Sequence, residues 1–299
     1  MSTPDRGLIS LQVGGWLAVF SSAFCFYLAT AIIRWAESSV VIETPYFVFS
    51  RFFMGFCVVC VTMLLSRRRL QPRRYDLLLV RTLTNTIAVF CFYKAVEVGS
   101  LAEANILNMT YPLFVALIAW FLIKEQRDAA VLLIVGVAFV GIWLIISPGG
   151  IGMKWENIWG LCSGISASLA MVSLNLSRRY HDSQTILFYM FGLGALLVFA
   201  LFSESIFWPN RQELFFLFSC SAVGVLGQYL LTYGFLFVTA VEGSIISSSR
   251  IFMAALFGPL LVGDPALTVT GWCGALLIFA ANSVLAYRKS TATATKGAG

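Results

Sequence analysis

Residues 93–125 read YKAVEVGSLAEANILNMTYPLFVALIAWFLIKE, and this stretch decides the fold. From residue 102 onward it is long enough to cross a bilayer, because about 20 apolar residues span the hydrocarbon core. Yet it carries Asn105, Asn108, a Tyr111-Pro112 pair and a Glu near each end. Hydrogen-bonding groups are tolerated at such depth where a helix faces the protein interior or a water-filled cavity. The stretch therefore predicts a membrane helix that lines a solute pathway.

The composition of the whole chain indicates a polytopic membrane protein. Of its 299 residues, 59% are hydrophobic and 11% are charged, whereas soluble domains hold about 25% charged residues. The first residues lack the basic start and cleavage site of a signal peptide, so we expect the first apolar run to be retained. The seven Cys lie in apolar runs and the single His, His181, lies in a loop. We therefore expect no disulfide framework, no metal site and no cofactor.

Ten apolar runs predict an all-α integral membrane protein with ten transmembrane helices and no soluble domain. Turn-forming residues such as Gly, Pro and Asn separate the runs. The tail 291–299 is expected to be disordered. The expected spans are 12–33, 45–66, 77–96, 102–123, 129–147, 157–177, 185–204, 212–237, 241–262 and 266–287.

Lys and Arg are distributed unequally between the two sets of loops. The set that includes both termini holds thirteen, five of them in residues 67–76, and the other set holds four. Because basic residues concentrate in cytoplasmic loops, we expect both termini in the cytoplasm and the protein in the inner (plasma) membrane, in contact with the lipid bilayer. The net charge of +6 follows from this distribution, so nucleic-acid binding is not expected.

The two halves of the chain resemble each other at an offset of 139 residues. Ala102-Glu103-Ala104 then aligns with Val241-Glu242-Gly243, and Lys124-Glu125 aligns with Gly263-Asp264. Each half holds five expected helices, and because five is odd, the second half enters the membrane from the opposite face. This pattern predicts inverted five-helix repeats over 1–150 and 151–290, a design that places the substrate site between the repeats. The alternative is that any two hydrophobic bundles look alike.

The quoted stretch resembles the EamA-type module of the drug/metabolite transporter superfamily. In that pattern Tyr93 and Ala95 close the third helix, small residues open the fourth, Pro112 lies within it and Glu125 ends it. The second copy departs from the pattern, since Arg250 and Ile251 stand where the first has Tyr111 and Pro112.

The resemblance covers nearly the whole chain and implies a ten-helix carrier. Helices 1, 3, 4, 6, 8 and 9 would line a central cavity, and helices 5 and 10 would lie at the periphery. A homodimer through helices 5 and 10 is an arrangement that this peripheral position allows.

Arg250 is the main candidate for substrate recognition. It lies about 14 Å from the inner end of the span 241–262, close to the middle of the bilayer. An Arg facing lipid at that depth costs about 2.5 to more than 10 kcal/mol, so it should face the protein interior or water. Because every acidic residue falls outside the spans or near their ends, we infer that Arg250 binds a carboxylate or phosphate of the substrate. The alternative is a structural Arg held by backbone carbonyls or by a Glu that reaches further in.

Helical spacing adds neighbours to Arg250. Ser247 shares its face, and the repeat pairs these two residues with Asn108 and Tyr111. Pro112 frees a backbone carbonyl near Asn108 and can bend the helix, which suits a gating element. An interhelical hydrogen bond, worth about 0.6 kcal/mol, is the alternative role for Asn108. The predicted substrate-binding residues are Arg250, Tyr111, Asn108, Ser247, Asn85 and Gln228.

Four charged residues are assigned gating or structural roles together with Pro112. Arg51 lies about two turns inside helix 2, and the resemblance implies a structural role for it, because an Arg or similar residue recurs there in EamA-like sequences. Lys94 and Glu103 flank the outer hairpin, where they form either a surface ion network or an extracellular gate. Glu242 is the counterpart of Glu103 in the second repeat and is grouped with it.

Two further assignments concern helices 3 and 1. Arg81 lies a turn from the cytoplasmic end of helix 3 and is expected to snorkel to the interface, whereas Asn85 is deeper. On helix 1, Phe20, Phe24 and Tyr27 are candidates for an aromatic wall.

These features predict a secondary-active or facilitative transporter, of exporter type, for a small organic metabolite with an anionic group. The resemblance implies a range of substrates in which amino acids and nucleoside- or nucleotide-type metabolites fit, and alternating access is the expected mechanism. Since no carboxylate is expected at mid-membrane depth, exchange or facilitated diffusion is as well supported as proton coupling. The rivals are a lipid scramblase or flippase, a channel and, with less support, a membrane enzyme that uses His181 and Asp182.

Overall fold

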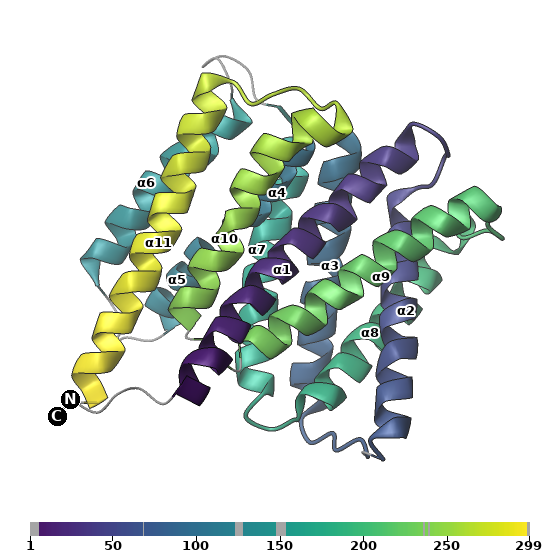
Figure 1. Cartoon of the computed structure of the whole chain (residues 1–299), viewed down its shortest axis with the longest axis horizontal. Coiled ribbons are helices and arrows are strands. Elements are labelled where there is room, and N and C mark those ends of the chain that lie inside the picture. The colour runs from purple at the N-terminus through teal and green to yellow at the C-terminus, as the bar shows by residue number, and fades with distance from the viewer. Residues whose placement is uncertain are drawn as a thin grey trace.

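The described part of this computed structural model contains ten helical segments that are long and apolar enough to cross a membrane (Figure 1). The structure describes residues 6–67, 69–122, 128–147, 154–235, 237–238 and 240–297, and no strand occurs among them. The all-helical class predicted from the sequence is therefore confirmed. The elements are α1 (Arg6–Glu37), α2 (Thr44–Leu65), α3 (Tyr75–Val98), α4 (Leu101–Asn108), α5 (Tyr111–Leu122), α6 (Ala129–Ile146), α7 (Asn157–Ser177), α8 (Ser183–Phe202), η2 (Ser203–Ser205), α9 (Arg211–Gly234), α10 (Ala240–Phe257), η3 (Gly258–Val262) and α11 (Val269–Gly297).

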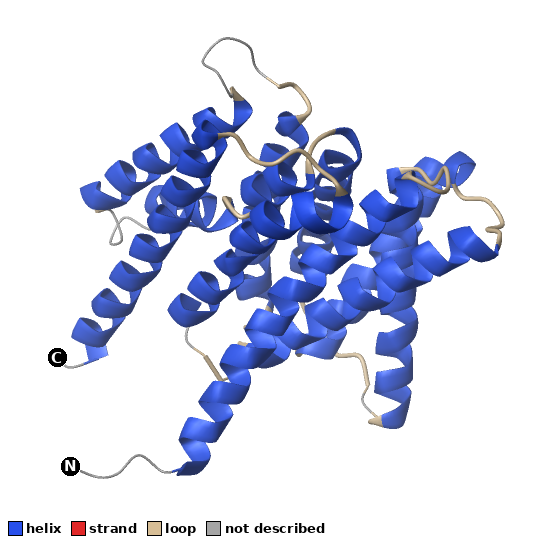
Figure 2. Cartoon of the chain, turned by 45° about the horizontal axis from the view of Figure 1, so that its top comes forward, coloured by secondary structure: helices blue, strands red, loops and turns tan. Residues whose placement is uncertain are grey.

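The helix α1 begins at the same side of the bundle at which α11 ends (Figures 1 and 2). We call this side the basic end, because the Arg-rich loop between α2 and α3 also lies there. The opposite side, where α1 ends and α11 begins, is the acidic end. The helix α11 continues to Gly297, into the segment 291–299 for which the sequence predicts a disordered tail.

The fourth membrane segment consists of two helices, α4 and α5, with a break at residues 109–110. Pro112 has no N–H to give to the carbonyl of Asn108. At the break, the Thr110 amide N–H donates to the carbonyl of Leu107 (3.1 Å), and the Thr110 hydroxyl donates to the same carbonyl. The interruption lies where the sequence places a bend. In the second half, Pro259 falls in the π-helical turn η3, which is followed by Gly263 with φ +71°.

Helices of the two halves pack against each other in reciprocal pairs. α1 lies against α9 and α10, while α7 lies against α3 and α4. The hydroxyl of Ser22 on α1 donates to the carbonyl of Gly227 on α9 (2.7 Å), and the hydroxyl of Ser163 on α7 donates to the carbonyl of Ala88 on α3 (2.9 Å). The same kind of contact thus ties each half to the other.

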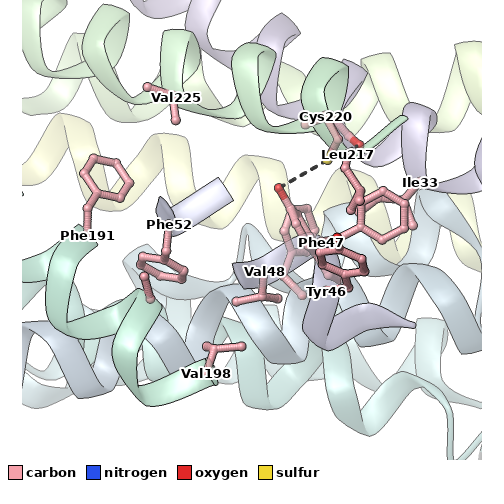
Figure 3. Packing of buried hydrophobic residues seen from close by; sticks show 14 of the residues in the cluster. Ile33, Tyr46, Phe47, Val48, Phe52, Phe191, Val198, Leu217, Cys220 and Val225 are labelled. Atoms are coloured by element: carbon pink, nitrogen blue, oxygen red, sulfur yellow. Dashed lines mark hydrogen bonds between the residues drawn. The ribbon is translucent and has the colours of Figure 1, made fainter. Parts of the chain in front are cut away.

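The contact between α2 and α8 is reciprocal as well. Phe52 and Phe191 meet edge to face with ring centroids 5.9 Å apart, deep in the cluster shown in Figure 3. The Phe191 ring covers Gly55 on α2, and the Phe52 ring covers Gly194 on α8. A Cβ at either Gly would lie under 3 Å from the ring, so each ring can pack in this position only because the residue opposite it has no side chain.

The helices α6 and α11 pack together through Gly141 and Gly274. A Cβ on Gly141 would lie 2.9 Å from the Gly274 carbonyl oxygen, and a Cβ on Gly274 would lie 2.6 Å from that of Gly141. Small residues let two membrane helices approach this closely. The homodimer through these two helices stays a prediction.

Candidate functional site

A cavity of about 470 Å³ lies between the two halves of the bundle and extends from its middle to the basic end. Side chains of α1, α3, α4, α5, α7, α9 and α10 line it, which are the helices 1, 3, 4, 6, 8 and 9 of the sequence prediction. Arg51 of α2 and Asn282 of α11 line it as well. Its volume falls in the range of small-molecule sites, about 300 to 1,000 Å³.

The six residues predicted to bind substrate all line this one cavity: Arg250, Tyr111, Asn108, Ser247, Asn85 and Gln228. Pro112, assigned to gating, lines it too, because the break between α4 and α5 faces the cavity. The Ser247 hydroxyl is buried and has no hydrogen-bond partner within the described part of the chain.

Arg250 is 4% exposed, yet it lines the cavity. One of its terminal nitrogens, Nη2, donates to the amide oxygen of Asn108, and its buried Nε has no partner among the residues that the structure describes. Its Cζ lies 5.0 Å from the centre of the Phe92 ring and 5.8 Å from that of Phe26. No ion pair to Arg250 occurs among the described residues. The guanidinium is thus surrounded by a neutral amide and two aromatic faces.

Asn108 connects Arg250 to two further helices. Its Nδ2 donates to the hydroxyl of Ser163 (2.6 Å), which in turn donates to the Ala88 carbonyl. Because the amide nitrogen is fixed in this way, the oxygen of Asn108 is oriented toward Arg250. The relay joins α10, α4, α7 and α3 at the depth of the cavity floor.

Arg51 is held by the protein itself. Its Nη1 donates to the Tyr93 hydroxyl (2.9 Å), and its Cζ lies over the rings of Phe26 (5.4 Å) and Tyr93 (5.7 Å). Gly224 gives it room, since a Cβ there would lie 3.2 Å from the Arg51 Nε. The Phe26 ring consequently lies near two guanidinium groups, those of Arg51 and Arg250.

The snorkelling expected of Arg81 is wrong. Arg81 is 5% exposed, lines the cavity and donates from Nη1 to the carbonyl of Ala170 (2.8 Å). The sequence estimate considered only depth along α3, whereas α7 and α8 pack on the face of α3 that carries Arg81. Its helical spacing with Asn85 and Phe92, which also line the cavity, was the signal that placed it inside.

Aromatic residues of the cavity differ from those that the sequence suggested. Phe20 and Phe24 are nearly half exposed on the outside of α1, and Tyr27 is fully buried, with a hydroxyl that has no hydrogen-bond partner among the described residues. Phe26 lines the cavity instead, one turn from Ser22, so the small and polar face of α1 would have located it. Sequence reasoning also missed Asn282, whose Nδ2 donates to the carbonyl of Met109 (2.9 Å).

The acidic end of the bundle is closed by ion pairs that lie outside the cavity lining. Arg34 pairs with Asp264 (2.8 Å) and donates to the Gly99 carbonyl (2.9 Å). The second oxygen of Asp264 accepts from the Leu101 amide (2.7 Å) at the start of α4. These contacts join α1, the turn before α4 and the segment after η3.

The predicted gating residues have separate positions. Glu103 is buried and pairs with Lys154 (2.8 Å), while Lys94 pairs with Glu97 (2.6 Å), which also accepts from the Thr44 hydroxyl. All of these lie at the acidic end. Glu242 belongs to α10, and its side chain lies outside the described part of the structure.

In the described part of the chain, ten apolar helices around a central cavity lined by arginine and amide side chains define a multi-pass membrane protein of the transporter class. Residues 13–147 and 154–287 each match the EamA-like transporter family. The chain belongs to the EamA-like transporter family, which confirms the resemblance to drug/metabolite transporters.

Three relatives carry transporter names. An uncharacterized transporter of Helicobacter pylori is 30% identical over 69% of this chain and 72% of its own length. The pseudopaline exporter CntI of Pseudomonas aeruginosa is 27% identical over 90% of this chain and 95% of its own. Human solute carrier family 35 member G1 is 24% identical over 71% of this chain and 62% of its own.

A solved crystal structure shares the fold, with a TM-score of 0.57 and 20% identity over 90% of this chain and 98% of the other. The likeness concerns the fold alone. The names of the relatives point to a transporter and away from an enzyme.

Proposed function

We propose that the protein exports a small organic metabolite with an anionic group across the inner membrane by alternating access. The anionic group would bind Arg250 in the central cavity, with Asn108, Tyr111, Ser247, Asn85 and Gln228 lining the same site. The family and the transporter-named relatives support transport, and the name of the Pseudomonas aeruginosa relative favours export.

One observation carries the choice of an anionic substrate. Arg250 is nearly fully buried beside the cavity, and its hydrogen-bond partner among the described residues is the neutral oxygen of Asn108. A buried charge is costly unless it is paired, and a guanidinium offers five N–H donors in a fork that fits a carboxylate or phosphate. The substrate would supply the missing negative charge.

We also propose that the two halves, 1–150 and 151–290, are inverted repeats. Two consecutive matches to one family model support the duplication. The reciprocal bonds Ser22–Gly227 and Ser163–Ala88 fit a two-fold axis in the membrane plane, as does the pair Phe52 and Phe191, which are separated by the offset of 139 residues. Such repeats place the site at their interface, where the cavity lies.

The orientation proposed from the basic loops determines to which side of the membrane the cavity opens. With both termini in the cytoplasm, the basic end faces the cytoplasm, and the cavity extends inward from it. The ion pairs of Asp264 and Glu103 then close the outer side. This is the state in which an exporter loads its substrate.

Counterflow in proteoliposomes tests the proposal. A thermal-shift screen of the purified protein against organic anions first selects a ligand, because a ligand that binds only the native state raises the melting temperature. Liposomes preloaded with that ligand should then accumulate its labelled form. The Arg250→Lys variant keeps the charge but loses the fork, so its rate should fall at least tenfold. A wild-type rate in that variant would refute recognition through the fork.

The same liposomes separate the rival classes. A carrier shows saturable uptake and counterflow, whereas a channel shows no counterflow. A scramblase would move fluorescent lipids between the leaflets and would not need Arg250. Transport that depends strictly on an imposed pH gradient would favour proton coupling over exchange or facilitated diffusion.

A further inference from the structure

The cavity carries more positive charge than a single anionic group requires. The charged side chains among its described lining residues are four arginines, Arg51, Arg81, Arg178 and Arg250, and none of these lining residues is Asp, Glu, Lys or His. A lining of one sign raises the local concentration of oppositely charged solutes. The question is which of the four are free to serve a ligand.

Arg51 donates to the Tyr93 hydroxyl and lies over two aromatic rings, and no nitrogen of Arg51 is both buried and without a partner in the part of the chain that the structure describes. Arg81 and Arg250 differ from Arg51 in this respect, and they resemble each other closely. Each is at least 95% buried and donates one hydrogen bond to a neutral oxygen, and the buried Nε of each has no partner among the described residues. The protein therefore leaves two buried guanidinium groups undercompensated in one cavity.

The two groups lie at different depths. Phe92, whose ring lies 5.0 Å from the Arg250 Cζ, is on α3 eleven residues after Arg81. At 1.5 Å per residue the backbone positions of Arg81 and Phe92 are about 16 Å apart. Arg178, an exposed lining residue, follows α7 on the Arg81 side and marks where the cavity reaches the basic end. A single anionic group of a ligand cannot bind Arg81 and Arg250 at the same time.

The wall between these depths is uncharged. Asn85, Ala167, Met171, Gln228 and Thr232 supply amide, hydroxyl and apolar surface. It suits a neutral linker between two charged ends.

We propose that the substrate carries two anionic groups, carboxylate or phosphate, held apart by a neutral linker. One group replaces the Asn108 oxygen at Arg250, and the second binds Arg81, with Arg178 at the entrance. This deepens the proposed function and rests on it, since the first group is the one assigned to Arg250.

Binding of paired probes tests the second group. The probes are the linear dicarboxylates from succinate to sebacate and their monomethyl esters, measured by thermal shift and by inhibition of counterflow at pH 7, where both carboxylates are ionised. A charge-assisted hydrogen bond supports an expected preference of about ten- to hundredfold for the best diacid over its monoester. Matching ω-phosphonocarboxylates show whether carboxylate or phosphate is the preferred second anion.

Variants locate the effect. Arg81→Gln should abolish the preference for the diacid while monoester binding persists, and Arg81→Lys should restore part of it. Arg179→Gln is the matched control, because it removes one charge from the exposed loop beside Arg178 but does not line the cavity, and it should keep the preference. Melting temperatures without ligand verify that each variant folds.

Three results would overturn the inference. They are equal binding of diacid and monoester in the wild type, a preference that survives Arg81→Gln, and no binding of any probe. The proposed function fails separately, if monoester binding is unchanged by Arg250→Gln. Monoester binding that needs Arg250, without a preference for diacids, would leave the proposed function standing and refute the second site.

Discussion

Arg250 on α10 donates to the amide oxygen of Asn108 on α4, across the interface between the two halves of the chain. Asn108 donates to Ser163, which donates to the Ala88 carbonyl, so α4, α7 and α3 together hold the oxygen that accepts from the guanidinium. This contact joins one half of the bundle to the other at the cavity wall. A ligand that takes the Asn108 oxygen's place would alter the contact between the halves, which is what alternating access requires.

Replacing Asn108 with Asp should weaken the binding of organic anions to the cavity. The new carboxylate would pair with Arg250 and stay ionised, because a neighbouring Arg lowers the pKa of an Asp. Affinity for an organic anion should fall at least tenfold, measured by thermal shift. Asn108→Ala adds no charge and should retain anion binding. Equal affinity in wild type and Asn108→Asp would show that the substrate does not compete for Arg250.

The Arg34–Asp264 pair should stabilise the closed acidic end. Asp264 is buried and accepts from both Arg34 and the Leu101 amide, so Asp264→Asn should lower the free energy of unfolding by about 1 to 3 kcal/mol. Asp128→Asn is the control, because the Asp128–Arg288 pair is exposed and pairs of that kind contribute little. Melting curves in detergent check both. The account of the closed end is wrong if the two variants melt alike.

Close contact of α6 and α11 should depend on Gly141. Gly141→Val would press a side chain against the Gly274 backbone, and overpacking of this kind destabilises by about 1 to 3 kcal/mol. Gly136 lies on the same helix with nothing within 4 Å of its Cβ position, so Gly136→Val should be tolerated. Melting temperature and the yield of folded protein distinguish the two, and a tolerated Gly141→Val would contradict the packing.

Reporter fusions should reveal the orientation. We expect a green fluorescent protein at the C-terminus to fluoresce and alkaline phosphatase inserted after Ser39, in the loop between α1 and α2, to be active. The first result places the basic end in the cytoplasm, and the second places the acidic end outside. The reverse pattern would turn the proposed loading state into a release state.

Much of the architecture follows from the sequence because its signals are local. The length of each apolar run sets a helix, and α7 begins and ends where the sequence predicts, at 157 and 177. Pro112 marks the break between α4 and α5 because a missing N–H acts within one turn. Helical spacing and the repeat offset predict that Arg250 and Asn108 face a common axis, and the two side chains are in contact.

Other features depend on how the helices pack against one another, and patterns within a single helix did not predict them. Arg81 looked close enough to the interface to snorkel, but α7 supplies the carbonyl of Ala170 and buries it. Phe26 differs from Phe24 only in the direction it faces, which the neighbours of α1 decide. Asp264 lies in a loop by sequence, yet it meets Arg34 from the other half of the chain. Contacts between distant segments are not encoded in local periodicity.

The most direct test compares an anionic ligand with its uncharged counterpart on wild-type protein and on Arg250→Met. For the organic anion selected by the screen and its neutral ester or amide, binding constants are measured for both proteins. The account predicts that wild type prefers the anion by at least tenfold and that Arg250→Met, which keeps the bulk but removes the charge, binds the two forms equally. An unchanged preference for the anion in Arg250→Met would contradict the claim that this buried guanidinium recognises the charge of the substrate.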